Sequence, residues 1–361
     1  MTILLFIVGL LFLIIGAEAL VRGASRLAAV LGISPLVIGL TVVAFGTSSP
    51  ELAVSIKSAL SGQASIAVGN VVGSNIFNVL FILGLSALIV PLVVAQQLVR
   101  LDVPLMIVLS VIVLAMSLDE SLSRVDGLML IAGLVIYIWF LIAQSRRESI
   151  EVREEYAREF GTKSVAKGIW GKNIGLIVGG LVLLVIGSRW LVDSAVAFAE
   201  YLGVSELVVG LTIVAAGTSL PEVVTSVIAA IRGERDIAVG NVVGSNLFNI
   251  MGVLGLASII APTGIDVSPA VIGFDIPVMI GVALVCLPIF FTGGVISRQE
   301  GLLLLGYYVA YTLYLVLAAS HHEALPGFGA AMLYFVVPLT AAILLIVALR
   351  QIHGRKRRSA E

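Results

Sequence analysis

Long apolar segments alternate with short polar stretches along the whole chain. We count about eleven, at residues 2–21, 33–58, 65–90, 103–118, 125–144, 173–193, 205–231, 237–261, 271–292, 299–319 and 328–350. Each is long enough for a helix to cross a hydrocarbon core of about 30 Å, the fourth only barely. Because a backbone in lipid must satisfy its own hydrogen bonds, we expect all of them to be helices. Pro338 lies inside the eleventh segment, which makes it the weakest of these predictions.

Composition supports a membrane protein. Of the 361 residues, 60% are hydrophobic and 12% are charged, whereas a soluble domain carries about 25% charged residues. This chain therefore has too little polar surface for a water-soluble globule. Cys286 is the only cysteine, which excludes an intramolecular disulfide. Three histidines in the whole chain give no support to a zinc site.

The basic residues predict an orientation. No basic residue precedes the first segment, and Arg22 and Arg26 follow it, which indicates a retained helix with its N-terminus outside. With that orientation, 18 of the 21 Lys and Arg residues lie on the cytoplasmic side, and only Lys57, Arg124 and Arg189 lie on or near the other side. An odd number of helices puts the basic tail inside. We therefore expect a multi-pass protein of the plasma (inner) membrane with a cytoplasmic C-terminus.

An internal repeat divides the chain into halves. The sequence GTSSPE at 46–51 returns as GTSLPE at 217–222, and IAVGNVVGSNIFN at 66–78 returns as IAVGNVVGSNLFN at 237–249. Each half has five segments, so the second half must enter the membrane from the opposite side, as in many secondary transporters. The predicted fold class is an all-α polytopic membrane protein with two inverted-topology five-helix repeats and an eleventh C-terminal helix.

The predicted organisation has four parts. The first repeat spans 1–144, and a cytoplasmic basic linker loop follows at 145–172. The second repeat spans 173–320, and residues 321–361 form the extra helix and a basic cytoplasmic tail.

A proline and a glutamate interrupt the second segment at depth. Pro50 cannot donate a hydrogen bond to Gly46, so we expect the helix to open there and the carbonyls near Ala44 and Thr47 to lose their helical partners. An ionised Glu51 at that depth costs about 2.5 kcal/mol or more unless a partner neutralises it. No Lys or Arg lies at a comparable depth in the neighbouring segments. A proton or a metal cation is the remaining partner, and Glu222 repeats the arrangement.

The second repeated motif is rich in small and amide side chains. Gly69 and Gly73 are spaced for close helix packing. Packing does not account for Ser74 and Asn78, which share one helix face. Their oxygens suit a hard cation such as Ca²⁺, which takes six to eight oxygen ligands. Hydrogen bonding between helices without an ion is the alternative.

Two other sets of polar residues have structural interpretations. We expect Asp102 and Asp275, each shortly before a proline, to be helix N-caps. Glu18 and Arg22 are four residues apart near the end of the first segment, which favours an ion pair.

With these paired motifs, residues 1–320 resemble the calcium/cation antiporter superfamily, specifically the prokaryotic sodium/calcium exchangers. The resemblance implies a ten-helix core in which the second, third, seventh and eighth helices form the ion site, and helices one and six slide against that bundle. It also implies an ion-binding set of two main carboxylates, four assisting carbonyls, four serines and two middle amides: Glu51 and Glu222; Thr47, Thr218, Ala44 and Ala215; Ser48, Ser74, Ser219 and Ser245; Asn78 and Asn249. Many relatives carry an aspartate where Asn249 stands, so the resemblance leaves the coupling stoichiometry and any potassium dependence undecided.

We expect a secondary antiporter that exchanges Ca²⁺ for Na⁺ by alternating access, with the ions bound between the repeats. We expect neither a cofactor nor enzymatic activity, and no partner beyond Ca²⁺, Na⁺ and the lipid bilayer. Nucleic acid is not expected, and a monomer is the expected assembly. The nearest alternative is H⁺/Ca²⁺ exchange through the same glutamates. A cation channel is a further alternative, and a membrane enzyme is disfavoured because the chain has no HExxH motif and no histidine at depth.

Overall fold

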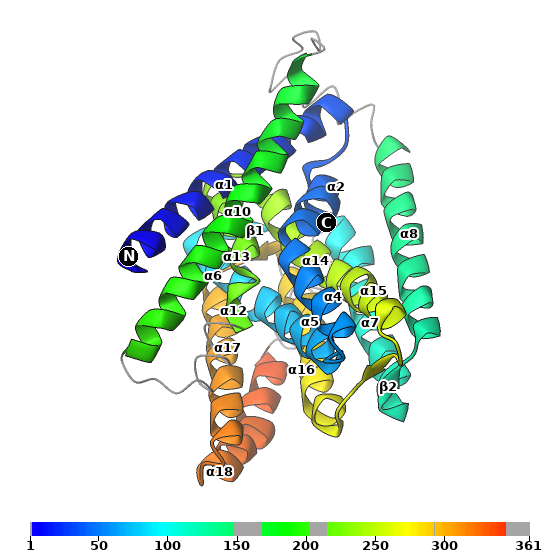
Figure 1. Cartoon of the computed structure of the whole chain (residues 1–361), viewed down its shortest axis with the longest axis vertical. Coiled ribbons are helices and arrows are strands. Elements are labelled where there is room, and N and C mark those ends of the chain that lie inside the picture. Colours follow the sequence, from blue (N-terminus) through cyan, green and yellow to red (C-terminus); the bar gives the residue numbers. More distant parts are fainter. Residues whose placement is uncertain (1, 148–167, 202–214, 292, 344–361) are drawn as a thin grey trace, which may run out of the picture.

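The computed structural model describes residues 2–147, 168–201, 215–291 and 293–343. Nearly all of these residues are helical (Figure 1). Within the described ranges, nine helices are long and apolar enough to cross a membrane, and a bent pair, Pro35–Thr47 with Ser49–Leu60, makes a tenth. The chain is therefore a multi-span helical protein, as predicted.

The elements of the two halves follow one another in a matching order, with π-helical turns inside several spans. The first half contains α1 (Thr2–Leu31), α2 (Pro35–Ile38), π-turn η1 (Gly39–Val43), α3 (Ala44–Thr47), α4 (Ser49–Leu60), α5 (Ser65–Phe77), π-turn η2 (Asn78–Leu83), α6 (Gly84–Ile89), β1 (Leu92–Val93), π-turn η3 (Leu98–Asp102), α7 (Val103–Met116), the 3₁₀ turn η4 (Ser117–Asp119), β2 (Ser121–Leu122) and α8 (Arg124–Arg147). The second contains α10 (Gly168–Tyr201), α12 (Ala215–Gly217), α13 (Leu220–Ile231), α14 (Arg235–Phe248), π-turn η6 (Asn249–Leu254), α15 (Gly255–Ile260), β3 (Ile265–Asp266), π-turn η7 (Val271–Asp275), α16 (Ile276–Phe291), β4 (Val295–Ile296) and α17 (Arg298–Ala319). The π-turns η2 and η6 begin at Asn78 and Asn249, which are equivalent residues of the repeat.

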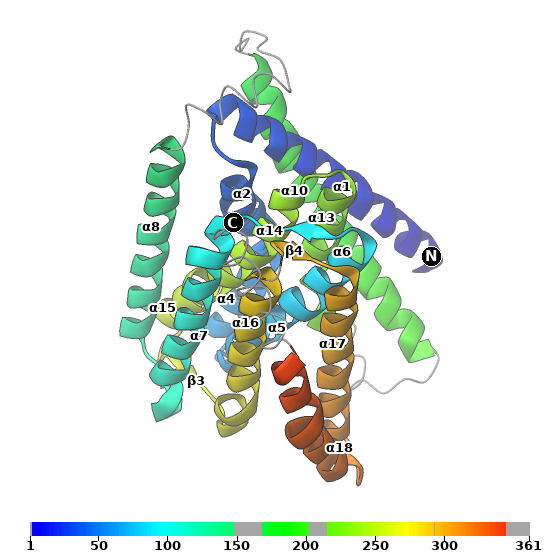
Figure 2. The ribbon, with the colours of Figure 1, turned by 180° about the vertical axis from the view of Figure 1, so that it is seen from behind.

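The longest helices, α1 and α10, lie side by side along one edge of the molecule (Figures 1 and 2). Their backbones meet at glycines. A Cβ placed on Gly16 would lie 2.8 Å from the carbonyl oxygen of Gly180, and Gly9 and Gly187 approach each other in the same way. Helix α1 is also ten residues longer than the predicted segment 2–21, and it ends before Gly32, whose φ of 63° suits a glycine.

The repeated motifs lie on the most enclosed helices. Most residues of the spans Arg235–Ile260 and Ser65–Ile89 are buried, whereas no residue of Leu325–Ile343 at the C-terminal end is buried. Two short antiparallel strand pairs, β1 with β4 and β2 with β3, join loops of the first half to loops of the second. The two halves are therefore interlocked around a core formed by both repeats of the motif helices.

The N-cap prediction for Asp102 and Asp275 was wrong. Each helix begins earlier, with the π-turn η3 or η7, so both aspartates lie inside continuous helix and neither caps an N-terminus. Their side chains instead accept hydrogen bonds from tyrosines of a neighbouring helix, Tyr137 to Asp102 Oδ1 at 2.8 Å and Tyr311 to Asp275 Oδ1 at 3.0 Å.

The remaining fold predictions fall partly outside the described residues. The predicted eleventh segment is helical from Leu325 to Ile343, through α18 (Leu325–Ala331) and π-turn η8 (Met332–Val336), and residues 344–350 lie outside the described part. Residues 148–167 of the predicted linker and 205–214 of the seventh segment also lie outside it. The ion pair of Glu18 with Arg22 is confirmed, and Arg232 joins it with its Nη2 atom 2.8 Å from Glu18 Oε1.

Candidate cation site

The predicted helix break at Pro50 is confirmed. Helix α3 ends at Thr47 and α4 begins at Ser49, with an angle of 46° between the two parts of the span. Ser48 between them has φ −81° and ψ 9°, and Ser219 has nearly the same values before α13. The breaks place Glu51 and Glu222 in the first turns of α4 and α13. Helix N-termini carry partial positive charge, so each break favours its carboxylate.

One detail of the break differs from the expectation. The Ala44 carbonyl keeps its helical partner, because it accepts the N–H of Ser48 at 3.0 Å. The chain turns only after Ser48, so the bond from Ser48 back to Ala44 survives. A carbonyl oxygen has a second lone pair, and the Thr47 hydroxyl oxygen lies 3.4 Å from the Ala44 oxygen.

The glutamates of the two halves are held by serines of the opposite halves. Ser48 donates its hydroxyl to Glu222 Oε1 at 2.8 Å, and Ser219 donates to Glu51 Oε1 at 2.7 Å. All four residues are buried, with exposures of 0% or 1%. Neither half therefore contains a complete site, since each carboxylate depends on a hydroxyl from the other.

The first asparagine of each GNVVGSN motif supports the backbone beside a glutamate. Asn70 donates to the Glu51 carbonyl at 3.1 Å, and Asn241 donates to the Glu222 carbonyl at 3.5 Å. These amides bind backbone and hydroxyl groups of α4 and α13, so they fix the helices that carry the carboxylates.

Four asparagines form a second symmetric arrangement. The predicted middle residues Asn78 and Asn249 donate their amide N–H groups to Asn246 Oδ1 at 2.9 Å and to Asn75 Oδ1 at 3.2 Å. Sequence analysis did not assign Asn75 or Asn246 to the site. The available signal was their presence in both copies of the motif at i−3 from the middle residue, on the same helix face.

Several buried oxygens in this region have no hydrogen-bond partner among the described residues. They are Glu51 Oε2, Glu222 Oε2, Asn78 Oδ1, Asn249 Oδ1 and Ser245 Oγ. A buried polar atom without a partner is costly, and native proteins rarely leave one unsatisfied. Their number and chemistry suit a hard cation, which binds carboxylate, amide and hydroxyl oxygens. A transported cation that binds here would satisfy these oxygens, which favours its binding.

Two more of the predicted residues, Thr47 and Ser74, contact polar side chains of the motif helices and breaks. Thr47 donates to Asn241 Oδ1 at 3.0 Å, and the Ser74 hydroxyl oxygen lies 3.3 Å from the hydroxyl oxygen of Ser219. Thr218 lies in the turn between α12 and α13 and is partly buried. Ala215 begins α12, and its side chain lies outside the described part.

The glycines of the second motif copy allow a close approach between helices of the two halves. A Cβ on Gly244 would lie 2.6 Å from Leu40 Cα, so this glycine lets η1 of the first half approach α14 of the second. No described atom lies within 4 Å of a Cβ on Gly69 or Gly73. Residues 202–214, which are the repeat equivalent of the segment that packs on Gly244, lie outside the described part, so close packing at Gly69 and Gly73 stays a prediction.

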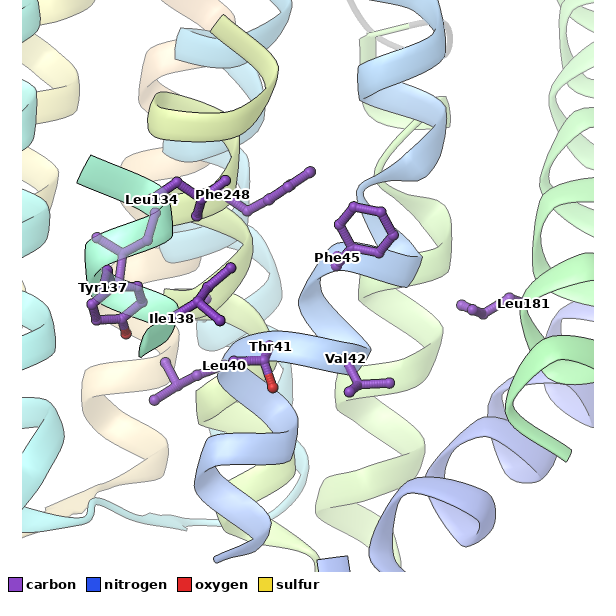
Figure 3. Close-up of a pocket in the computed structure, with 11 residues that line it drawn as sticks. Leu40, Thr41, Val42, Phe45, Leu134, Tyr137, Ile138, Leu181 and Phe248 are labelled. Atoms are coloured by element: carbon purple, nitrogen blue, oxygen red, sulfur yellow. The ribbon is translucent and has the colours of Figure 1, made fainter. Parts of the chain in front are cut away.

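A separate pocket of about 360 Å³ lies between η1, α3, α8 and α14, with Leu181 of α10 on its border (Figure 3). Its lining is mostly apolar, including Phe45, Leu134 and Phe248, and it contains neither glutamate. A lining without a carboxylate offers no charge to balance a cation, so this pocket is not the ion site.

Comparisons with known proteins agree with the geometry. The family model described as "Sodium/calcium exchanger protein" matches residues 1–143 and 172–317. The inner membrane protein YrbG of Escherichia coli (strain K12) is 41% identical over 283 residues, which cover 78% of this chain and 86% of that protein. The sodium/calcium exchanger MaX1 of Methanosarcina acetivorans is 34% identical over 343 residues, covering 86% of this chain and 97% of that protein.

A solved structure is also similar. The sodium/calcium exchanger from Methanococcus jannaschii superposes with a TM-score of 0.72 at 29% sequence identity, over 86% of this chain and 97% of that chain. The eleventh span at Leu325–Ile343 lies beyond the family-model match, which ends at residue 317.

Proposed function

The chain belongs to the sodium/calcium exchanger protein family and is a membrane cation antiporter, and we propose that it exchanges Ca²⁺ for Na⁺. The observation that carries this proposal is the crossed pair of serine–glutamate hydrogen bonds. Each glutamate uses one oxygen for a serine of the other half and keeps the second oxygen free of protein partners among the described residues. Two carboxylate oxygens and neighbouring neutral oxygens in a buried cage suit Ca²⁺.

The site in this proposal lies between repeats that span 1–144 and 173–320, joined by the linker loop 145–172. Glu51 and Glu222 carry the charge, and the amides of Asn78 and Asn249 provide neutral oxygens between them. The serines and carbonyls named for the exchanger family complete the shells: Ser48, Ser74, Ser219 and Ser245, with the carbonyls of Thr47, Thr218, Ala44 and Ala215.

Competition for the same oxygens couples the two fluxes. Ca²⁺ and Na⁺ bind alternately, and a site without cations leaves two buried carboxylates uncompensated. That state is costly in a low-dielectric interior, so it resists the change of access and limits leak. Alternating access then requires the α1–α10 pair to move relative to the motif helices, and the backbone contacts at Gly16 and Gly180 favour movement of this pair as one body.

Sodium is favoured over protons by the hydroxyl groups that flank the carboxylates. A proton needs a single oxygen, whereas Na⁺ needs several, and Ser74 and Ser219 provide hydroxyls 3.3 Å apart beside Glu51. The distribution of basic residues supports a plasma (inner) membrane location with the N-terminus outside and the basic C-terminal tail in the cytoplasm.

Uptake of calcium-45 into proteoliposomes preloaded with sodium tests the proposal. Controls carry a pH gradient alone or no gradient. We expect uptake only with the outward sodium gradient. Uptake with the pH gradient alone would replace sodium by protons as the counter-ion, and no uptake with any gradient would refute calcium transport.

Variants connect the flux to the site. Glu51→Gln and Glu222→Gln remove one charge each and should each abolish uptake, since the remaining carboxylate cannot balance Ca²⁺. Glu323→Gln, at an exposed glutamate in the turn before α18, is the matched control and should transport normally. Retained exchange in either site variant would contradict the assignment.

A further inference from the structure

The amides in the middle of the site have a fixed orientation. Asn75 donates its side-chain N–H to the Asn246 backbone carbonyl at 3.3 Å, and Asn246 donates to the Asn75 carbonyl at 3.4 Å. A backbone carbonyl can only accept, so each of these side chains must point its amide nitrogen at the other backbone. Their Oδ1 atoms are thereby turned toward Asn249 and Asn78.

That orientation determines what the middle residues present to the ions. Asn249 and Asn78 meet an acceptor oxygen, so each must donate its own amide N–H there, at 3.2 and 2.9 Å. Their Oδ1 atoms then face away from Asn75 and Asn246, and both have no partner among the described residues. Asn75 and Asn246 are therefore positioning residues: they bind no ion themselves, and they aim two neutral oxygens at the site.

The charge of the site follows from this geometry. Glu51 and Glu222 are the carboxylates of the site, and its other ligands are hydroxyl, amide or carbonyl oxygens. Within the described ranges, no three His, Cys, Asp or Glu residues gather in a group that could hold a metal ion. One divalent cation or two monovalent cations balance two carboxylates. A third monovalent cation would leave an uncompensated positive charge among glutamate, serine and asparagine side chains that are at most 3% exposed.

We infer that this antiporter exchanges two monovalent cations for each divalent cation, so that transport is electroneutral. This inference rests on the proposed calcium exchange and adds its stoichiometry. The asparagine pairs leave the middle position of the site without a charge. The two glutamates therefore set the net charge of the site at −2.

A zero-flux measurement in proteoliposomes tests the stoichiometry. The equilibrium ratio of calcium inside to outside is measured with calcium-45 at several sodium gradients, with the membrane potential set by potassium and valinomycin. Two-for-one exchange makes the calcium ratio follow the square of the sodium ratio at every potential. Three-for-one exchange makes the calcium ratio follow the cube of the sodium ratio. It also moves one net charge per cycle, so the calcium ratio would change by roughly 50-fold for each 100 mV of membrane potential.

The outcomes separate the two proposals. A cubic relation or a change with potential overturns the stoichiometry and leaves calcium/sodium exchange standing. A square relation to the proton gradient, with no response to sodium, supports the stoichiometry and overturns sodium as the counter-ion. The absence of calcium flux under any gradient overturns both.

A double-mutant cycle tests the positioning role. Asn75→Ala frees the amide of Asn249 to turn, so the KM for calcium should rise about tenfold, as expected for a lost hydrogen bond near a charge, with a smaller change in maximal rate. In an Asn249→Leu background, Asn75→Ala should have little further effect on KM, because no amide remains to be oriented. Additive losses in the double variant would overturn the positioning role, and the wild-type stoichiometry measurement does not depend on whether these variants fold.

Discussion

Two adjacent glycines of α10 allow the contact between α1 and α10 to be tested directly. A Cβ on Gly180 would lie 2.7 Å from both the carbonyl oxygen of Gly16 and the backbone nitrogen of Leu20. A Cβ on Gly179, one residue earlier, meets no described atom within 4 Å. Gly180→Ala and Gly179→Ala therefore make the same chemical change in the same helix, and only the first forces the two backbones apart.

The expected difference can be worked out from two opposing effects. Replacing a helical glycine by alanine stabilises the helix by roughly 0.5–1 kcal/mol at either position. At Gly180 the new methyl group also overlaps backbone atoms of α1, which cannot rotate away as a side chain would. Overpacking of this kind costs typically 1–3 kcal/mol. We expect Gly179→Ala to be slightly more stable than the wild type and Gly180→Ala to be less stable than Gly179→Ala by about 1–3 kcal/mol.

Unfolding in detergent by increasing SDS, followed by circular dichroism, measures this difference. Both variants should retain the wild-type helix content before the transition, and the Gly180→Ala transition should come at a lower SDS fraction. Equal transitions for the two variants would refute the backbone contact between α1 and α10. The same pair of proteins in calcium uptake would show whether separation of the two helices slows exchange.

Three further predictions use other contacts of the structure. Ser48→Ala removes the 2.8 Å hydrogen bond to Glu222 and should raise the KM for calcium about tenfold or more, whereas Ser49→Ala, which loses only a bond to the Phe45 carbonyl, should leave it nearly unchanged in the calcium-45 assay. Tyr137→Phe removes a hydrogen bond to the fully buried Asp102 and should lower the free energy of unfolding by about 1–3 kcal/mol. Tyr311→Phe, at the less buried Asp275, should lower it by a smaller amount in the same SDS titration. Equal losses for the two variants would contradict the effect of burial. Arg232→Gln breaks the ion pair between Arg232, at the end of α13, and Glu18 of α1. Because both partners are partly exposed to solvent, the free energy of unfolding should change by no more than about 1 kcal/mol. A larger change would mean that this pair is a main connection between the two helices.

The motifs of the site were predictable because each deviation from an apolar helix has a local physical cause. Pro50 removes a helical donor and Glu51 adds a charge at depth, so the break and a need for a counter-charge follow from two residues. The repeat then predicts a second copy in the opposite orientation. The structure confirms the break, and it brings Ser48 of one copy to Glu222 of the other.

Other features depend on contacts that no local pattern contains. The N-cap prediction for Asp102 failed because the helix had already begun at Leu98, and only the fold brings Tyr137 to that carboxylate. The roles of Asn75 and Asn246 required knowledge that each side chain reaches the backbone of the other half. The length of α1 was underestimated because Arg22 and Arg26 suggested the end of a span, whereas the helix continues beyond them.

Helix α10 connects the two breaks mechanically. A Cβ on Gly46 would lie 2.6 Å from Leu181 Cδ2, and one on Gly217 would lie 2.6 Å from Val192 Cγ2. Leu181 and Val192 are eleven residues apart in α10, which is about three helical turns and places them on one face. Both breaks are therefore packed against the same rigid helix, and any displacement of α10 along its axis alters the contacts at both glycines together. Because the serine that follows each glycine holds the glutamate of the other half, a change at either break reaches both carboxylates. This arrangement gives a physical reason why the two halves of the site cannot open independently.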